Sequence, residues 1–344
     1  MSFPKVTIQI VTYNSVKYLP DCLRSIFNQT YRDFQVLAVD NNSQDNTVEF
    51  LKRNYPLVTV FQNKKNLGFA RANNQGLKLL NSPYVVFCNA DVILEPDWLE
   101  KIMARAADEN YRRVGSFGGK LLKVKILDKE LNEIEKLNVA DSCGLKLYKN
   151  HQVVERGIGE PSEKFMSDEL VFGQSAALAL FRREALEECL IKTKSVPEGE
   201  YFDEDFFFYK EDVDLSWRLQ LMGWGSLFVA GAVAYHFRSF GATAGGFKMV
   251  FKNRRKQSRF ARYYSHRNHL LVLIKNEFFG NLLKYFFPIC WYELKKKIYL
   301  LFFEPYNLKS FFSVISLLPR MITKRKVIFK KAKIKAVDIR KWIN

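Results

Sequence analysis

The sequence predicts an α/β protein built on a doubly wound sheet and followed by a helical tail rich in basic and aromatic residues. Over residues 1 to about 110, short apolar segments alternate with segments of helical periodicity, a pattern typical of parallel sheets. The charge then changes abruptly. Residues 241–344 contain 24 lysines and arginines against 4 acidic residues, whereas the first 240 contain 30 against 32. The net charge of +18 therefore belongs to the tail.

The first part of the chain supplies four expected strands, over residues 5–13, 34–40, 57–63 and 84–90. Helices are expected between them, over 19–27, 46–54 and 68–80. The fourth strand is apolar at five consecutive positions, Tyr84 to Cys88, which is typical of a strand buried on both faces. Residues 111–240 are more mixed, with shorter strands and one clear helix over 211–223, which Gly223 is placed to end.

Bulk composition is that of a globular protein, with 48% apolar and 26% charged residues in 344, enough for one large domain or two. The five cysteines are scattered and none forms a C-x-x-C pair. Such a set indicates reduced thiols in a cytosolic protein and argues against a disulfide framework or a zinc site. The first residues lack a basic segment followed by a cleavable apolar one, so no secretory signal is expected.

Polar residues cluster where three of the predicted strands end. They are Tyr13, Asn14, Asp40, Asn41, Asn89 and Asp91. In open α/β sheets, ligands bind at the carboxyl ends of the strands. Asp91 beside Asn89 suits a hard divalent cation that also takes phosphate oxygens, but an aspartate here could instead cap the following helix. Asp40 could likewise be an ordinary turn residue.

Three further positions carry candidate chemistry. Arg71, in the first turn of a helix, suits an anion contact, although 66–76 could be a plain loop-to-helix junction. Glu211 and Asp212 follow four aromatic residues, which would desolvate a carboxylate and suit a general base; favourable charge at a helix N-terminus explains both acids equally well. His236 ends an apolar strand, and it could be either a core histidine or a metal ligand.

Taken in order, these stretches resemble inverting glycosyltransferases of family 2, which have the GT-A fold. The matching segments span residues 5–236, about two-thirds of the chain, and are "VTIQIVTYN", "LAVDNNSQDNT", "NLGFARANNQGL", "FCNADVIL", "FGQSAALALFRREAL" and "YKEDVDLSWRLQLMGWGSLFVAGAVAYH". An Asn-x-Asp in place of Asp-x-Asp, together with "VDNNS", looks most like rhamnosyltransferases that use dTDP-rhamnose. "YYSHRNHLLVLIKN" is similar to the segment that follows the catalytic domain in those enzymes.

The resemblance implies a role for each matching residue. Asp212 would be the catalytic base, with Glu211 beside it, and Asp91 would bind Mg²⁺ or Mn²⁺, with His236 near the same site. Asp40 would hold a pyrimidine ring. The other donor-binding residues would be Thr12, Tyr13, Asn14, Asn41, Asn66, Gly68, Arg71 and Asn89. Two positions depart from the family pattern: many relatives have two acids where this chain has Asp40-Asn41, and Asn89 replaces the first acid of the metal motif.

The resemblance also implies an organisation and a reaction. A catalytic domain would cover residues 1–240, with a nucleotide-binding half over about 1–110 and an acceptor half over about 111–240, and residues 241–344 would form the tail. The expected reaction moves rhamnose from dTDP-rhamnose to a hydroxyl of a lipid-diphosphate-linked or polysaccharide acceptor in bacterial surface glycan synthesis. A UDP- or GDP-sugar donor is the alternative.

Residues 275–335 of the tail interleave aromatics with lysines, and no apolar run reaches the roughly 18 to 20 residues of a spanning helix. We expect an amphipathic segment on an anionic membrane surface, which would make the protein cytoplasmic and peripheral at the inner face of the cell membrane. The alternative is a solvated basic face over aromatics that pack on the core. A nucleic-acid-binding protein would also explain the charge but not the ordered acids, so no nucleic acid is expected. Whether the protein forms a homodimer stays an open question at this point.

Overall fold

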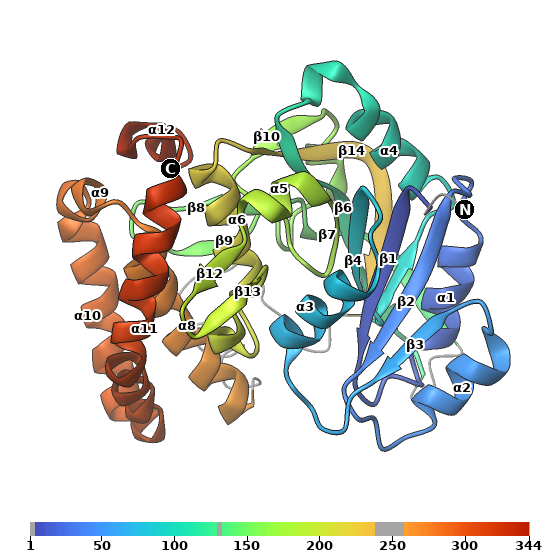
Figure 1. Ribbon diagram of the computed structural model, residues 1–344, viewed down its shortest axis with the longest axis horizontal. Coiled ribbons are helices and arrows are strands. Elements are labelled where there is room, and N and C mark those ends of the chain that lie inside the picture. Colours follow the sequence, from blue (N-terminus) through green and yellow to red (C-terminus); the bar gives the residue numbers. More distant parts are fainter. Residues whose placement is uncertain (1–3, 129–132, 238–257, 344) are drawn as a thin grey trace.

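The computed structural model describes residues 4–128, 133–237 and 258–343. One mixed sheet lies at its centre, in the order β10-β14-β6-β11-β4-β1-β2-β3 (Figure 1). Its strands are β1 (Val6–Thr12), β2 (Phe34–Asp40), β3 (Thr59–Gln62), β4 (Tyr84–Asn89), β6 (Val114–Ile126), β10 (Glu169–Val171), β11 (Leu178–Arg182) and β14 (Gly225–His236). Off this path, β5 (Val92–Leu94) pairs with β14 and β7 (Ile134–Ser142) pairs with β6.

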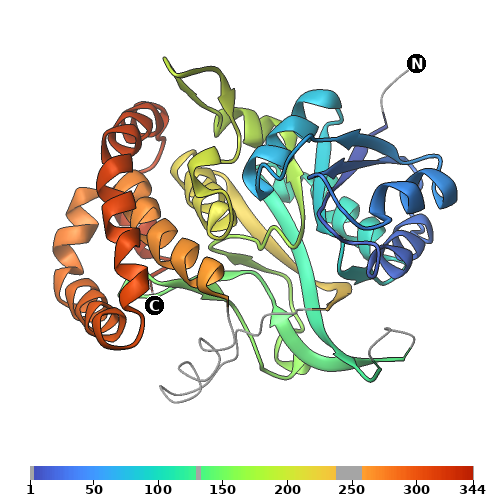
Figure 2. The same ribbon diagram turned by 90° about the horizontal axis from the view of Figure 1, so that it is seen from below.

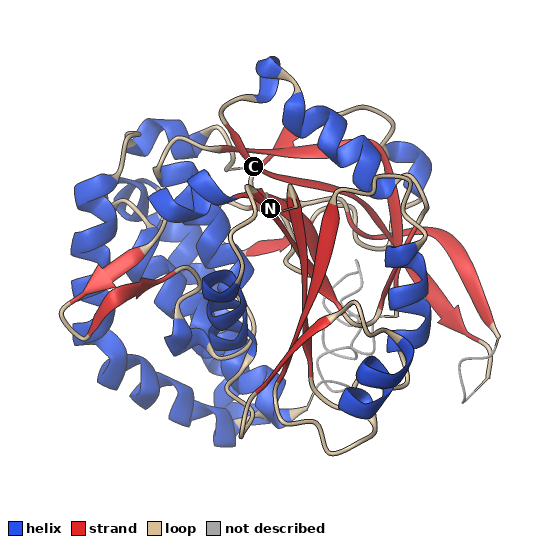
Figure 3. Cartoon of the chain, turned by 45° about the vertical axis from the view of Figure 1, so that its right-hand side comes forward, coloured by secondary structure: helices blue, strands red, loops and turns tan. Residues whose placement is uncertain are grey.

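The first half of the sheet is parallel, as predicted. β1 pairs in parallel with both β2 and β4, and β2 pairs with β3. The expected helices are α1 (Leu19–Phe27), α2 (Thr47–Asn54) and α3 (Phe69–Leu79), and helices flank the sheet on both sides (Figure 3). Val85 to Cys88 are buried, which confirms the strand predicted to be covered on both faces. β3 is shorter than expected because Leu57 is 81% exposed and lies outside the sheet.

The second half makes the sheet mixed. β11 lies antiparallel to both β4 and β6, and β14 runs parallel to β6. The helices here are α4 (Trp98–Ala107), α5 (Arg183–Glu188) and α6 (Glu211–Leu221), and short two-stranded sheets join β8 (Leu145–Leu147) to β9 (Val153–Glu155) and β12 (Ile191–Thr193) to β13 (Val196–Glu200). Gly223, at φ 74°, follows α6 as its predicted terminator.

The tail is helical, as predicted, and forms a block at one side of the sheet (Figures 1 and 2). Its helices are α8 (Arg259–Asn276), α9 (Phe279–Lys284), α10 (Phe286–Phe303), α11 (Lys309–Lys331) and α12 (Ala336–Arg340). Leu271 of α8 and Met321 of α11 join the buried cluster that contains Trp217 of α6. The predicted boundary at residue 240 lies outside the described residues.

Buried charges also join the tail to the rest of the protein. Lys275 of α8 pairs with Asp203 and lies 2.7 Å from Asp214 Oδ1. Lys324 of α11 pairs with Asp203 as well, and its Nζ lies 2.6 Å from Glu200 Oε1. We call these five side chains, together with Asp205, the charged interface. Burial would raise the pKa of Asp203, but the two lysines outweigh it and hold that pKa well below its ordinary value.

Candidate active site

The ends of β1 and β2 meet at Asp40. Its carboxylate is buried and accepts hydrogen bonds from Thr12 Oγ1 at 2.8 Å, from Ser43 N at 2.9 Å and from Ser43 Oγ. Asn14, at φ 52°, ties the same loops together, because its Oδ1 accepts from Gln44 N at 2.7 Å. The turn role of Asp40 is thus confirmed, and its contact with a pyrimidine stays a prediction. Tyr13 is 49% exposed at this edge.

Asn41 links the end of β2 to the start of α3. Its Nδ2 donates to Gly68 O at 3.1 Å, and its Oδ1 accepts from Asn63 Nδ2 at 3.0 Å. Asn66 accepts from Gly68 N at 2.9 Å. Gly68 is required here, because its φ is 82° and an added Cβ would come within 2.6 Å of Phe207 O. An amide, unlike the second acid of many relatives, can both donate and accept in this network.

The structure brings Asp91 and His236 together, although 145 residues separate them in the chain. β5 pairs with β14 so that Val92 lies opposite His236, and His236 Nε2 lies 3.3 Å from Asp91 Oδ1. Its Nδ1 lies 2.9 Å from Oδ2 of Asp141, which is buried in β7. Burial would lower the pKa of His236, but the two carboxylates outweigh it and raise that pKa to about 9. Asp97, not Asp91, precedes α4, so the capping alternative for Asp91 fails.

This arrangement fits a divalent cation. A carboxylate on the second ring nitrogen orients a ligating histidine, and Asp141 stands in that position relative to His236. The side chain of Asp91 is 25% exposed and can reach a bound group. Within the described ranges, no group of three or more potential side-chain ligands is arranged to hold a metal. Asp91 and His236 would be two ligands of such a cation, and phosphate oxygens and water would be suited to the others.

Asp212 lies near the same strand end. Its Oδ1 accepts a hydrogen bond from Val213 N at 2.7 Å, and the Ala176 amide also acts on this carboxyl and works to lower its pKa. The next carbonyl, of Ala177, accepts from Asn89 N at 2.8 Å. Asp212 is partly exposed, whereas Glu211 is buried and its Oε2 has no hydrogen-bond partner among the described residues. Burial raises the pKa of both carboxyls. A partly exposed carboxylate of raised basicity is suited to take a proton.

The loop before these acids is conformationally strained. Phe207, Tyr209 and Lys210 have φ values of 59°, 69° and 68°, each costing on the order of 1–3 kcal/mol for a residue with a side chain. The loop also contacts the start of α3, because Phe69 N donates to Phe207 O at 2.9 Å. Arg71, half exposed in the first turn of α3, lies 3.5 Å from Glu204.

Two residues of the tail hold this loop, and neither was predicted to have a role. Asn268 of α8 donates from Nδ2 to the carbonyls of Phe206, Phe208 and Tyr209 at 2.9, 2.8 and 2.7 Å. Arg267 donates to Phe206 O at 3.2 Å. Both lie in the stretch "SHRNH", whose similarity to known enzymes was the available signal. Asp141 was also missed, and no local pattern marks it.

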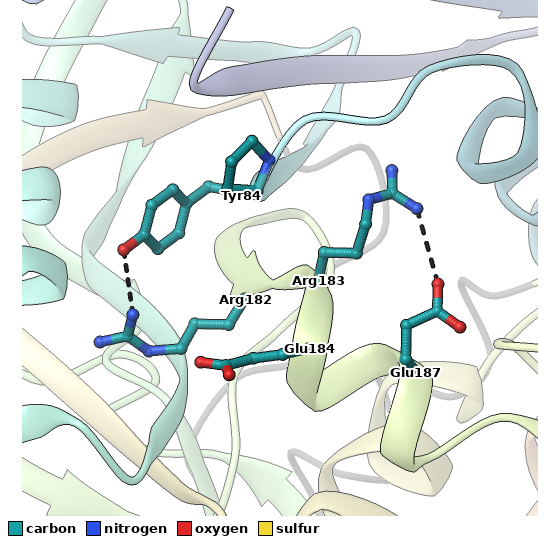
Figure 4. Close-up of a pocket in the computed structure, with 6 residues that line it drawn as sticks. Tyr84, Arg182, Arg183, Glu184 and Glu187 are labelled. Atoms are coloured by element: carbon teal, nitrogen blue, oxygen red, sulfur yellow. Dashed lines mark hydrogen bonds and ion pairs between the residues drawn. The ribbon is translucent and has the colours of Figure 1, made fainter. Parts of the chain in front are cut away.

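A hollow of about 370 Å³ lies elsewhere, at the opposite end of β4, and is lined by Pro83, Tyr84, Arg182, Arg183, Glu184 and Glu187 (Figure 4). Its two guanidinium groups are already engaged. Arg182 donates to Val114 O and Ala106 O, and Arg183 donates to Ser82 O and Leu80 O. These arginines therefore support the fold, and the hollow is not the candidate site.

Comparison with known proteins gives the family. Residues 7–190, more than half of the chain, match the pattern that defines glycosyl transferase family 2. The chain belongs to this family. A similar relative is an uncharacterized glycosyltransferase of Haemophilus influenzae, 33% identical over 103 residues that cover 29% of this chain and 32% of the relative. Chondroitin synthase of Escherichia coli is 37% identical over 100 residues, which cover 28% of this chain and 14% of the synthase.

Among solved structures, GalNAc-T7 with UDP, GalNAc and Mn²⁺ is similar, with a TM-score of 0.56 and 15% identity. The alignment covers 78% of this chain and 48% of that one. Such a likeness concerns the fold, and it confirms the GT-A architecture of the family 2 chain. The chain spans about a third or less of the two relatives named above.

Proposed function

We propose that this family 2 protein transfers a sugar from a nucleotide-activated donor to a hydroxyl group, with inversion at the anomeric carbon. The observation that carries the proposal is the short path from the start of α6, which carries Asp212, to the end of β4 at Asn89. The Ala176 amide acts on the Asp212 carboxyl, and Asn89 N donates to the next carbonyl, of Ala177, at 2.8 Å. A carboxylate of raised pKa thus lies close to the strand end that carries Asp91, and the two groups can act on one donor and one acceptor.

Asp212 is the general base in this proposal. It takes the proton of the acceptor hydroxyl as the oxygen bonds to the anomeric carbon. The bond from that carbon to the diphosphate oxygen breaks on the opposite face, and the nucleoside diphosphate leaves with the bonding electrons. Glu211, buried beside Asp212, holds a second carboxyl at the start of α6 and keeps the site polar behind the base.

The donor occupies the carboxyl edge of the parallel strands. The nucleoside lies against Thr12, Tyr13, Asn14 and Asp40, whose loops are bonded to one another. Asn41, Asn66 and Gly68 shape the loop before α3. Arg71 and Asn89 contact the diphosphate and sugar in this proposal, since Arg71 is half exposed and its ion pair with Glu204 is long, at 3.5 Å.

Asp91 and His236 would hold Mg²⁺ or Mn²⁺, which would neutralise the charge that develops on the leaving diphosphate. The Mn²⁺ and UDP bound to GalNAc-T7, a protein of similar fold, support this part of the proposal. Asp141 would be a positioning residue, because it fixes the ring of His236 from behind.

We further propose dTDP-rhamnose as the donor, on the strength of Asn89-Ala90-Asp91 and "VDNNS"; a UDP- or GDP-sugar is the alternative. A growing surface glycan, either free or carried on a lipid diphosphate at the inner face of the cell membrane, is the proposed acceptor. The similarity to a chondroitin synthase, which builds a polysaccharide, supports a glycan acceptor. The catalytic unit would cover residues 1–240.

A donor panel tests the proposal. We expect dTDP-rhamnose with Mn²⁺ to raise the melting temperature more than UDP- or GDP-sugars do. Asp212→Asn should keep that shift while release of nucleoside diphosphate falls by about 10² to 10⁴. Glu211→Gln is the matched comparison and should lose less activity, because its carboxyl is buried. Equal melting temperatures with every nucleotide, or full turnover in Asp212→Asn, would contradict the proposal.

A further inference from the structure

The C-terminal helices expose an unusual amount of apolar surface. Of the 25 large apolar residues that are exposed in the described chain, 16 lie within residues 258–343. The exposed fraction reaches 83% for Phe287, 73% for Phe312, 71% for Phe302 and 61% for Trp291. We call the exposed apolar side chains of α9, α10 and α11 the apolar outer face. Patches of this kind mark interaction surfaces.

On α10 the exposed residues follow helical periodicity. Phe287, Trp291, Leu294, Ile298 and Leu301 are all exposed and are spaced alternately by four and three residues. They therefore form one stripe along the helix. α10 lies at the outer edge of the molecule, on the side away from the sheet, in both Figure 1 and Figure 2. The stripe thus faces outward and is not covered by another described element.

The acidic groups of these helices are buried, on the side opposite the apolar outer face. Residues 279–331, all of which the structure describes, contain eleven lysines and arginines but only two acids, Glu293 and Glu304. Both acids are buried: Glu293 Oε1 lies 3.0 Å from His269 Nε2, and Glu304 Oε1 lies 3.2 Å from Arg262. Every exposed charge on α9, α10 and α11 is therefore positive.

Cations border the stripe directly. Lys295 Nζ lies 4.8 Å from the ring centroid of Trp291, and Lys297 Nζ lies 5.7 Å from that of Phe311. Lys297 also lines a hollow of about 360 Å³ with Ile298, Leu301, Leu308 and Phe311. An apolar hollow beside an ammonium group has the chemistry that an acyl chain below a phosphate head group requires.

We propose that the apolar outer face lies on an anionic phospholipid bilayer, with α10 parallel to the surface. No helix in residues 4–128, 133–237 or 258–343 combines the length and hydrophobicity needed to cross a bilayer, whereas an in-plane helix needs only one apolar side. A second copy of the chain fits less well, because a two-fold contact would bring the same lysines face to face. This inference goes beyond the proposed function and is tested without a donor sugar.

Trp291 provides a reporter at the proposed contact. Trp98, Trp217 and Trp224 are buried and Trp342 is half-buried, so Trp291 is the most exposed of the five tryptophans. The full-length protein is mixed with vesicles of phosphatidylcholine alone or with one-third phosphatidylglycerol. We expect the protein to sediment with the anionic vesicles and its tryptophan emission to shift to the blue. Binding to the anionic vesicles should be at least tenfold tighter than binding to neutral vesicles. Trp291→Phe should bind but lose the shift.

A matched pair of variants distinguishes binding through the apolar outer face from non-specific binding through other exposed apolar residues. Phe287→Ser/Leu294→Ser/Phe302→Ser should weaken binding to anionic vesicles at least tenfold. The control, Leu57→Ser/Met166→Ser/Leu170→Ser, removes apolar residues of similar exposure that lie before the tail. It should bind anionic vesicles as the wild-type protein does.

Four results would overturn the proposal. The first is no sedimentation of the wild-type protein, a measurement that does not depend on whether the variants fold. The second is binding that leaves Trp291 emission unchanged. The third is a dimer, measured by light scattering, that the triple substitution dissociates with a red shift of Trp291 emission. The fourth is a single-stranded oligonucleotide that shifts Trp291 emission while vesicles do not.

Discussion

The sheet half and the helical tail distribute polarity in opposite ways. In the sheet half, Ile8, Ile10, Val86 and other apolar strand residues are buried, and the polar groups gather at the strand ends. In the tail, α10 buries a carboxylate, Glu293, and exposes Phe287 and Trp291. The tail therefore buries acidic groups, together with apolar packing, on the side toward the protein and exposes apolar side chains on the other side.

This difference shows how the tail is bound. Apolar packing joins it to the acceptor half through Leu271 and Met321, but the charged interface determines how the helices align. Buried ion pairs add little net stability compared with apolar packing, yet they are costly to break on one side. We infer that the charged interface fixes the register of α8 and α11, so that Asn268 meets its loop and the apolar outer face remains outward.

Removing one lysine of the charged interface should have the largest effect on stability. Lys324 is 3% exposed and pairs with Glu200, Asp203 and Asp205. Lys324→Met leaves three carboxylates without this partner in a buried site. We expect the free energy of unfolding to fall by about 3–5 kcal/mol, measured by urea denaturation followed by circular dichroism.

Lys326→Met is the matched control, because Lys326 is an exposed lysine two residues further along α11. It should change the free energy of unfolding by less than about 0.5 kcal/mol. If the two variants were equally stable, the charged interface would not fix the tail, and the contrast between the two regions would reduce to surface composition.

Asn268→Ala tests whether the tail positions the strained loop. The change removes the donor for three backbone carbonyls, so residues 206–210 should relax toward unstrained conformations and shift Asp212. We expect release of nucleoside diphosphate to fall about tenfold to a hundredfold, with donor binding unchanged. Hydrogen exchange of a peptide that spans residues 204–212 should rise in the same variant.

Asn276→Ala provides the control for this effect. Asn276 is a buried asparagine at the other end of α8 and donates to Asp214 Oδ1 at 2.7 Å. Both variants should lose about 1–3 kcal/mol of stability. If Asn276→Ala lost as much activity as Asn268→Ala, with the loop peptide equally protected in both, the role of Asn268 would be structural only.

The sequence predicted the sheet half well because its signals are local. Periodicity marks each strand and helix, polar residues mark the strand ends, and two acids follow an aromatic run at a helix start, so Asp91 and Asp212 could both be proposed from local signals. Asp141 could not, because its partner His236 lies 95 residues away. The strained loop was not predictable either, since Phe207, Tyr209 and Lys210 are not residue types that favour positive φ.

The tail was harder because one pattern, aromatics among lysines, predicts two structures. A membrane face and a packed aromatic stripe have similar composition, and the structure contains both packed and exposed aromatic residues. Phe278 packs on Phe329 with ring centroids 5.0 Å apart, whereas Phe279, the next residue, is 68% exposed. The arrangement of α8 and α11 decides which aromatic side chains are packed and which are exposed. The pairing of Lys275 and Lys324 with acids near residue 203 had no local signal at all.

The smallest expected effect concerns a buried pair between the tail and the turn that joins β8 to β9. Glu277, after α8, and His151 are both fully buried, with Oε2 3.0 Å from Nδ1. Burial raises the pKa of Glu277 to about 7, while Asn281, Phe278 N, Arg325 and Arg340 act in the opposite direction. The folded protein therefore holds a proton that the unfolded chain releases above its pKa of about 4.3. Stability from this group is present below pH 4 and is lost as the pH rises toward 7.

We expect the wild-type protein to lose about 1–2 kcal/mol of unfolding free energy from this group between pH 5 and 7. Burial also lowers the pKa of His151 to about 4, which destabilises the fold as the pH falls below about 6.5 and partly masks the slope. Glu277→Gln keeps the shape without the titration, so the difference between variant and wild type isolates Glu277. Urea unfolding at pH 5, 6, 7 and 8 measures it. If the difference in unfolding free energy between variant and wild type stayed constant from pH 5 to 8, Glu277 would be ionised in the folded protein over that range. The inner side of the tail would then solvate its charges as fully as the strand ends of the sheet do.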